Sequence, residues 1–339
     1  MKLNQRREDG LLDAANRLQR SATKTGRLTL SALADAPFGL EIRGLEPENI
    51  TQDDKAYIWE AHRVAHGLLC FSFERLLEAH ELHALTSVFG ESEYAPGIIN
   101  GLGKQPTPSE KHLTVEQQLA IVRARGEDPF MTYIGNLDPT TLRKQSLYEE
   151  FYSEWEWHTD MSYIETPPTF SLLHARQVPH EGGDTGFCNQ VMAAQELTDV
   201  TRNRVSKLKI KHDSTYNSDG SLRPGMVAPE SPIEALGYPH PVIRTMPNTD
   251  IEALYLGRRT NGYILGMTLE ESEQLLNKLW AHATQAQFCY RHKWRPGQVV
   301  VWDNRLLMHK RFPMDDQTVR FMWRTQTKGE AVQPVTSSS

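Results

Sequence analysis

Cysteine is scarce in this chain of 339 residues, and its few copies stand far apart. The three cysteines are Cys70, Cys188 and Cys289, and they form none of the closely spaced pairs that bind zinc or build a disulfide framework. This pattern argues for a reducing compartment, so we expect a cytoplasmic protein. The N-terminal segment 1–27 also has no apolar core of the kind that a signal peptide needs.

Long apolar runs and an excess of positive charge are absent as well. No run of about 18 apolar residues exists, so nothing in the sequence is expected to span a membrane. The formal net charge is −6, which gives no basic surface of the kind that attracts nucleic acid. We therefore expect a small-molecule partner, with neither nucleic acid nor a membrane as a partner.

Two short segments far apart in the chain carry residues that suit one metal ion. His158 and Asp160 are two positions apart, so on an extended strand their side chains project from the same face. His309 supplies a third ligand from a distant part of the chain. Two imidazoles and one carboxylate leave several metal positions open, which is typical of non-haem Fe(II) oxygenases. A His-x-Asp triplet also arises by chance, so it needs support from other residues.

A cationic residue that follows His309 by eleven positions indicates a co-substrate. Arg320 is expected on the next strand, where its planar guanidinium can hold a carboxylate through two hydrogen bonds. Thr185 can donate its hydroxyl to the same carboxylate. An oxo acid that chelates the metal at one end needs such partners at its other end. The alternative is that Arg320 is a surface charge and Thr185 a turn residue.

Several short runs give the chain a resemblance to a known family. They are Trp157-His158-Thr159-Asp160, Thr166-Pro167-Pro168, Gly182-Gly183-Asp184-Thr185, Trp302-Asp303-Asn304-Arg305, His309 and Arg320-Phe321-Met322-Trp323-Arg324. From about residue 26 to about residue 328 the chain resembles the TauD/TfdA (taurine dioxygenase-like) family of Fe(II)/2-oxoglutarate-dependent dioxygenases. The resemblance implies that His158, Asp160 and His309 are the iron ligands. It likewise implies that Thr185 and Arg320 clamp 2-oxoglutarate.

The resemblance also implies a fold and a reaction. The fold would be α+β, with a double-stranded β-helix core (jelly roll, cupin-like) flanked by helices and long lid loops. Residues 27–330 would form the dioxygenase domain, residues 1–26 a helical extension and residues 331–339 a disordered tail. The reaction would use Fe(II), 2-oxoglutarate and O2 to hydroxylate a C–H bond, with release of succinate and CO2. The family also favours a homo-oligomer, either a dimer or a tetramer.

The substrate pocket is where this chain departs from taurine dioxygenase. That enzyme has a substrate-binding histidine shortly after its Phe-Gly-Glu, whereas here residues 89–91 lead into residues 92–96, which argues against taurine. Glu154 precedes the metal-binding run, and with Arg324 it would suit a zwitterionic, amino-acid-like molecule. A solvated loop charge at Glu154 is the simpler alternative. The candidate substrate residues are Arg324, Tyr133, Glu154, Trp157 and Ala95.

Hydrophobic periodicity and capping signals predict the secondary structure. Helices are expected at 9–19, 51–66, 76–89 and 268–285, and strands at 68–71, 130–134, 169–174 and 299–302. Residues 97–128 are expected to form a mobile lid, and residues 213–262 a long excursion with an active-site loop. His174 is expected to be a hydrogen-bonded core histidine, and Asp303 and Asn304 to orient His309.

Three alternatives stay open. The same iron and co-substrate could drive desaturation, cyclisation or another oxidative outcome in a specialised biosynthetic pathway. A non-catalytic jelly roll could bind the metal or 2-oxoglutarate without turnover, although all five family positions are filled here. A zinc hydrolase could use the same metal ligands, but it would leave Arg320 and Thr185 without a role.

Overall fold

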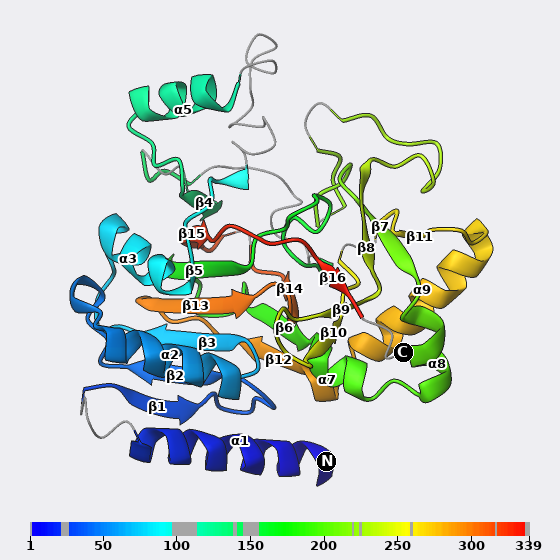
Figure 1. Ribbon diagram of the computed structural model, residues 1–339. Coiled ribbons are helices and arrows are strands. Elements are labelled where there is room, and N and C mark those ends of the chain that lie inside the picture. The colour runs from blue at the N-terminus through cyan, green and yellow to red at the C-terminus, as the bar shows by residue number, and fades with distance from the viewer. Residues whose placement is uncertain are drawn as a thin grey trace.

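The computed structural model describes residues 2–21, 27–96, 114–137, 141–144, 156–218, 220–223, 226–257, 260–315 and 317–335. Helices and strands are mixed along this part of the chain. Its strands form one seven-stranded sheet and three three-stranded sheets. Figure 1 shows the large sheet with helices against it and the smaller sheets to one side.

The seven-stranded sheet combines strands from both ends of the chain. Its order is β1 (Thr29–Ala32), β2 (Leu40–Arg43), β3 (Leu68–Ser72), β13 (Gln298–Asp303), β5 (Phe170–Gln177), β15 (Phe321–Gln326) and β4 (Thr132–Gly135). β13 lies antiparallel between β3 and β5. The apolar runs predicted at 68–71 and 299–302 are therefore neighbouring central strands, and both are almost entirely buried.

A smaller sheet places the second set of predicted site residues. It contains β12 (Cys289–His292), β6 (Thr185–Asn189) and β14 (Leu307–Arg311), in that order. In the β6–β14 pair, Thr185 is opposite Arg311 and Phe187 is opposite His309. Directly opposite residues of an antiparallel pair point to the same side of the sheet. One face of this sheet therefore carries Thr185, Phe187, His309 and Arg311 together.

The same sheet brings two cysteines together. Cys188 on β6 is opposite Cys289 on β12, and their sulfur atoms are 3.2 Å apart. Both thiols are free, and burial raises the pKa of Cys188 well above its ordinary value. These two cysteines are thus far apart in the sequence but adjacent in the fold.

The segment predicted as an irregular excursion contains strands of its own. The remaining sheets are β11 (Tyr263–Ile264), β7 (Lys209–Asp213) and β8 (Gly237–Pro241), and then β10 (Glu252–Leu254), β9 (Ile243–Thr245) and β16 (Gln333–Pro334). These strands are two to five residues long, which is too short for a clear alternating pattern. β16 pairs with β9, so ordered structure continues beyond the domain end predicted at residue 330.

Helices cover the large sheet and flank the smaller ones. They are α1 (Lys2–Ser21), α2 (Gln52–Val64), α3 (Ala79–Phe89), α5 (Val115–Ala124), α7 (Gln190–Gln195), α8 (Asp199–Val205) and α9 (Leu269–Ala283), with 3₁₀ turns at Pro47–Asn49 and Ala286–Phe288. Capping boxes at Thr51 and Thr268 begin α2 and α9 as predicted. α5 begins at a capping box on Thr114 inside the predicted lid, of which residues 97–113 lie outside the described residues. In the described ranges, no helix has both the length and the apolar character needed to cross a membrane.

β13 separates two apolar cores by the alternation of its side chains. Val299 and Val301 face the cluster that includes the buried side of α2 and α3. Val300 and Trp302 face the other cluster, which includes Phe187 and the buried side of α9. The second cluster also borders His309, because the Trp302 and His309 ring centres are 4.8 Å apart. The metal-ligand candidate therefore lies at the edge of a dry interior.

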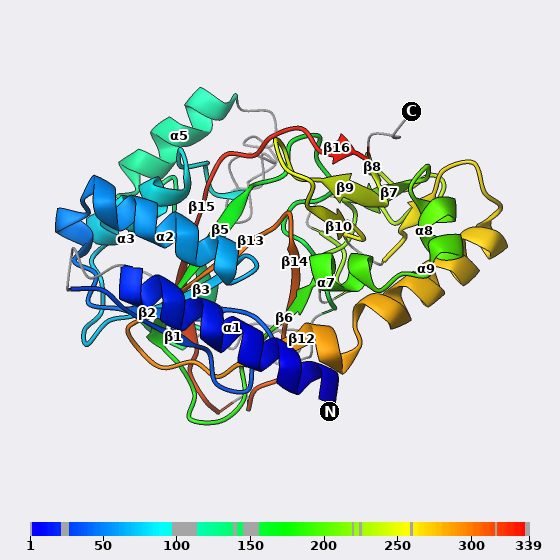
Figure 2. The same ribbon diagram turned by 60° about the horizontal axis from the view of Figure 1, so that its bottom comes forward.

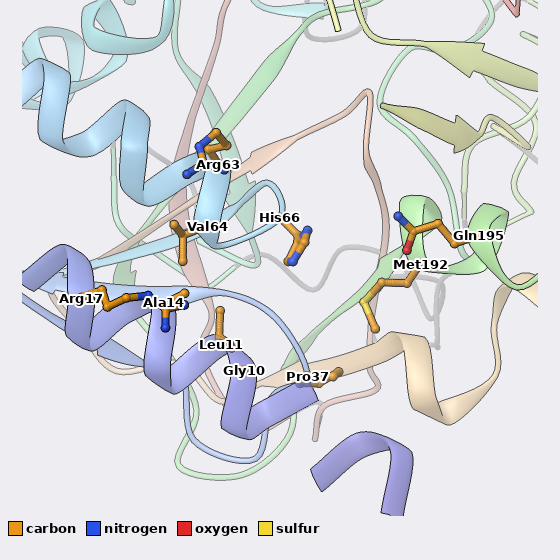
Figure 3. A pocket seen from close by; sticks show the side chains of 10 residues that line it. All are labelled: Gly10, Leu11, Ala14, Arg17, Pro37, Arg63, Val64, His66, Met192 and Gln195. Carbon is orange, nitrogen blue, oxygen red and sulfur yellow. The ribbon is translucent and has the colours of Figure 1, made fainter. Parts of the chain in front are cut away.

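The N-terminal helix is packed on the body of the protein. Leu11 and Ala15 of α1 are buried, and α1 contacts β1 and α2 (Figures 1 and 2). A hollow of about 510 Å³ lies between α1, α2 and α7, with Arg17, Arg63 and Met192 among the residues that line it (Figure 3). None of the residues predicted to bind metal or co-substrate lines this hollow. It is a feature of how the extension packs and is separate from the predicted metal site.

Candidate metal centre

His158, Asp160 and His309 come together in the structure. All three are buried, and one potential ligand atom from each lies within 4.8 Å of the other two. Asp160 Oδ1 is 3.8 Å from His309 Nε2, and the two imidazole ring centres are 4.2 Å apart. The backbones of His158 and His309 exchange two hydrogen bonds, of 2.9 and 2.8 Å. This bridge fixes the spacing between two segments that are distant in sequence, and the group could hold a metal ion.

The backbone at one of the two ligand segments differs from the predicted one. His309 lies inside β14, which a short turn at residues 304–306 joins to β13. His158 forms an isolated bridge, and the chain then turns at Asp160 and Met161, where φ of Met161 is +47°. The prediction of one extended strand through His158 and Asp160 is therefore wrong. The turn, and not strand alternation, directs the carboxylate toward His309.

A hydrogen bond selects the tautomer of the first histidine. His158 Nδ1 is 2.8 Å from the carbonyl oxygen of Glu156. A carbonyl oxygen only accepts, so Nδ1 carries the proton and donates it. Nε2 of His158 is then left with a lone pair, as a metal ligand requires.

A chain of three side-chain hydrogen bonds holds the carboxylate of Asp160. The hydroxyl of Ser171 donates to Asp160 Oδ2 at 2.7 Å, and the amide of Asn304 donates to Ser171 at 2.9 Å. The indole N–H of Trp302 donates to Asn304 Oδ1 at 3.0 Å. Asn304 was predicted to orient His309, but its side chain acts on Asp160 through Ser171. These bonds leave Oδ1 of Asp160 directed toward the other candidate ligands.

Asp303 has a different role from the one predicted. Its carboxylate is buried and pairs with Arg305 at 2.7 Å, and it lies 3.4 Å from His62 Nε2. Burial raises the pKa of Asp303, but Arg305 more than offsets this and holds it well below its usual range. Asp303 therefore joins α2 to the end of β13.

The charge of Asp160 suits a divalent cation. Burial alone would raise the pKa of this carboxyl, but Arg324 and the two histidines hold it well below its usual range. Arg324 Nη1 is 3.2 Å from Asp160 Oδ1. A carboxylate that is ionised at neutral pH binds a metal without first losing a proton. Arg324, predicted to meet a substrate anion, thus borders the metal-ligand group directly.

The predicted co-substrate residues are buried at the start of β6 and just before β15. Arg320 Nε donates to the carbonyl of Gly183 at 3.1 Å, and the Arg320 backbone N–H donates to Asn136 Oδ1 at 2.9 Å. The indole N–H of Trp294 donates to Thr185 Oγ1 at 3.0 Å. Because that oxygen already accepts, its own hydrogen is available to a carboxylate. Thr185 therefore has the polarity that a clamp needs.

The buried guanidinium of Arg320 is incompletely hydrogen-bonded within the described residues. Burial lowers its pKa to about 9, and the neighbouring charge of Arg311 acts in the same direction. Its Nη1 is buried and makes no hydrogen bond to any described residue. A buried guanidinium in this state is costly unless a negative group pairs with it. The pocket thus fits the far carboxylate of an oxo acid.

Tyr133 lies on the wrong face for a substrate residue. On the β15–β4 pair, Tyr133 is opposite Trp323, whereas Arg324 is opposite Thr132. Side chains alternate along a strand, so Tyr133 and Arg324 point to opposite faces of the sheet. Tyr133 instead packs on Phe321 and Trp323. The structure therefore does not support its predicted place in the substrate pocket.

Trp157 packs on the outer side of the small sheet. A Cβ atom at Gly186 would lie 2.9 Å from its ring, and Lys310 Nζ is 5.2 Å from its ring centre. Gly186 and Lys310 are opposite each other on β6 and β14, on the face away from His309. Trp157 thus supports the strands that carry the site from behind.

Ala95 and Glu154 are the remaining substrate candidates, and the structure describes only Ala95. Ala95 follows Tyr94, whose carbonyl accepts a hydrogen bond of 2.9 Å from the side chain of Gln326. The same side chain lies 3.7 Å from the sulfur of Met161, the residue after Asp160. The segment with Ala95 is thus one side chain removed from the metal-ligand group. Glu154 lies outside the described residues.

Sequence reasoning missed three residues that shape the site. Ser171 and Trp294 reach it only through tertiary pairing, so no local pattern could reveal them. Arg311 did leave a signal, because it follows His309 by two positions and must share its face of β14. The predicted core histidine is as expected: His174 Nδ1 lies 3.1 Å from the carbonyl of Gln298, and its Nε2 accepts the Leu77 N–H at 3.0 Å.

Comparisons with known proteins agree with this geometry. A family model described as taurine catabolism dioxygenase TauD, TfdA family matches residues 29–326. The chain is 32% identical over 233 residues to the (S)-phenoxypropionate/alpha-ketoglutarate-dioxygenase of Sphingobium herbicidovorans, a match that covers 65% of this chain and 80% of that protein. It is 32% identical over 168 residues to an alpha-ketoglutarate-dependent sulfonate dioxygenase of Saccharomyces cerevisiae, covering 48% of this chain and 39% of that protein.

A solved structure shows that the likeness extends to the fold. The crystal structure of a taurine dioxygenase from Burkholderia xenovorans superposes with a TM-score of 0.64 at 25% sequence identity, covering 91% of this chain and 93% of that one. The mixed fold with its large sheet is therefore the fold of these dioxygenases. Fe(II), 2-oxoglutarate and O2 are the reagents of this enzyme family, and the His-Asp-His group matches that chemistry. The chain belongs to the TauD, TfdA family of 2-oxoglutarate-dependent dioxygenases.

Proposed function

We propose that this protein hydroxylates a C–H bond of a small anionic or zwitterionic molecule, with release of succinate and CO2. The observation that carries the proposal is the joint burial of a His-Asp-His group and a guanidinium that needs an anion. Either feature alone has a structural explanation. Together they match a metal with an oxo acid anchored at its far end.

In this proposal, His158, Asp160 and His309 hold Fe(II), and Arg320 and Thr185 bind the far carboxylate of 2-oxoglutarate. When bound, Fe(II), 2-oxoglutarate and O2 supply the oxidising chemistry. The protein's own residues orient the ligands through Ser171 and the carbonyl of Glu156. The apolar cluster behind His309 excludes water from this side of the site.

Arg324 is the residue that we propose for substrate charge. Its Nη1 pairs with Asp160, while its Nε is buried without a hydrogen-bond partner in the described residues. The names of two relatives, a phenoxypropionate and a sulfonate dioxygenase, both specify anions. An anion at Arg324 would therefore reach the immediate neighbourhood of Asp160. Glu154 stays a candidate partner for a substrate cation.

The finer description of the fold belongs to the same proposal. We infer that the seven-stranded sheet and the β12–β6–β14 sheet are the two halves of a double-stranded β-helix, because Asp160 contacts Ser171 and Arg324 of the first sheet and lies 3.8 Å from His309 of the second. The dioxygenase domain would then run from residue 27 through β16, with residues 1–26 as its extension. Assembly into a dimer or tetramer stays a prediction.

The experiment is succinate release from 2-oxoglutarate under air, with Fe(II), ascorbate and a panel of small carboxylates, sulfonates, sulfate esters and amino acids. Asp160→Ala is the control. Substrate-stimulated succinate that disappears in Asp160→Ala supports the proposal, and the product mass separates hydroxylation from desaturation or cyclisation. Binding of both Fe(II) and 2-oxoglutarate without succinate for any panel member would favour a non-catalytic protein. Failure to bind either would contradict the proposal.

A further inference from the structure

Arg311 lies where the far end of the co-substrate is expected. It is buried on β14 and directly opposite Thr185 on β6, so both side chains project from the same face. His309, two positions earlier on the same strand, projects from that face as well. One face of this sheet thus carries His309, a candidate metal ligand, and then Arg311, whose side chain lies beside Thr185.

A second guanidinium, that of Arg320, is close to Arg311. The positive charge of Arg311 lowers the pKa of Arg320, and the carboxylate of Asp184 acts in the opposite direction. That carboxylate is shared, because Arg291 Nε binds it at 2.6 Å. Two buried cations repel each other in a medium of low dielectric constant. An anion that binds both guanidiniums would reduce this repulsion.

We propose that Arg311 is a second arginine of the co-substrate pocket, where it binds the far carboxylate of the oxo acid together with Arg320 and Thr185. This inference rests on the proposed function of the metal centre. Two guanidiniums and a hydroxyl around one carboxylate make the pocket select dicarboxylic 2-oxo acids. An oxo acid of equal length with a methyl group at that end would offer no acceptor to either guanidinium and would leave Arg320 Nη1 without an anion.

The test measures binding in the absence of O2, so that it does not depend on turnover. Fe(II)-loaded protein is titrated with 2-oxoglutarate and with 2-oxovalerate, in which a methyl replaces the far carboxylate. We compare Arg311→Ala and Arg311→Lys with the unmodified chain, and use Lys310→Ala, on the opposite face of β14, as the matched control. Fe(II) affinity is measured separately without oxo acid.

We expect Arg311→Ala to weaken 2-oxoglutarate binding by about tenfold to a hundredfold, as loss of a charged hydrogen bond does. The preference over 2-oxovalerate should fall by the same factor, and Arg311→Lys should restore part of it. Lys310→Ala should retain both. A structural role of Arg311 would weaken both oxo acids alike and leave the preference unchanged.

The outcomes separate this inference from the proposed function. If the unmodified chain binds Fe(II) and 2-oxoglutarate but Arg311→Ala keeps the preference within about twofold, the inference is wrong and the function stands. If the unmodified chain binds no 2-oxoglutarate, the function itself fails. Should Arg311→Ala not fold, Arg311→Gln against Arg311→Lys decides, since equal preference in these two would also refute the inference.

Discussion

Ser171→Ala is the substitution that most directly tests how the metal-ligand group is held. The hydroxyl of Ser171 donates to Asp160 Oδ2 and accepts from the amide of Asn304, and no part of this residue is exposed to solvent. Alanine removes both bonds, while the backbone of β5 stays the same. Asp160 then loses a donor, and Asn304 is left with a buried N–H that lacks its acceptor.

The size of the effect follows from these two losses. A hydrogen bond to a charged group contributes about 1.5–3 kcal/mol, and an unsatisfied buried donor costs about 1–3 kcal/mol. Residues that orient metal ligands typically change metal affinity by about tenfold to a hundredfold. We therefore expect Ser171→Ala to weaken Fe(II) binding by about that factor. The free energy of unfolding of the metal-free protein should fall by about 2.5–6 kcal/mol if the two losses add.

The assay is anaerobic Fe(II) titration, with chemical denaturation of the metal-free protein alongside it. Thr86→Val is the matched control, because it removes a buried hydroxyl that contacts Thr325 at 2.7 Å on the far side of the large sheet. It should lower stability and leave Fe(II) affinity unchanged. Ser171→Thr keeps the hydroxyl and should recover most of the affinity. Equal Fe(II) affinity in Ser171→Ala and the unmodified protein would refute the proposed role of this hydrogen-bond chain.

Three further predictions concern acid stability, the clamp and the substrate face. Burial lowers the pKa of His174 to about 4 from an ordinary value of 6.5. Between these two pH values the imidazole is protonated in the unfolded chain and neutral in the folded chain. Stability should therefore fall by up to about 3 kcal/mol from this group as pH drops from 6.5 toward 4. His174→Gln should make the fall of the denaturation midpoint across that window smaller, and the remaining fall should come from other buried histidines such as His240 and His292. Gly183 has φ of +66°, and a Cβ atom there would lie 3.3 Å from Arg320 Cδ. Gly183→Ala should therefore lower the free energy of unfolding by about 1–2 kcal/mol and weaken the binding of 2-oxoglutarate, measured by direct titration. Tyr133→Phe should keep succinate release within about twofold of the unmodified enzyme, because Tyr133 points away from Arg324; a tenfold loss would place it in the pocket after all.

The sequence contained the ligand identities but little of the geometry between them. His158, Asp160 and His309 could be chosen because few residue types bind iron and their spacing matched a known pattern. The turn at Met161, which directs the carboxylate, has no sequence signal of its own, since a methionine with positive φ is held there by its surroundings. The orienting roles of Ser171 and Trp294 depend on which strands pair.

Strand pairing explains the other differences too. Cys188 and Cys289 are distant in sequence, yet the β6–β12 register places their sulfur atoms 3.2 Å apart. Tyr133 was chosen because it is aromatic and lies on a predicted strand, but the face it occupies depends on its register with β15. A shift of one residue reverses the face of every side chain, and a single sequence does not specify that register.

The charges of the interior connect the two parts of the site. Arg311, Arg320 and Arg324 are all largely withdrawn from solvent, and Asp160 is the carboxylate that contacts one of them at 3.2 Å. A dicarboxylic oxo acid would bring two negative charges to the first two arginines and the metal, and an anionic substrate would bring a third to Arg324. Each anionic ligand would thus reduce the repulsion between these buried cations. We therefore expect 2-oxoglutarate to raise the thermal unfolding midpoint of the Fe(II)-loaded protein more than 2-oxovalerate does. The difference between the two midpoints should be smaller in Arg311→Ala.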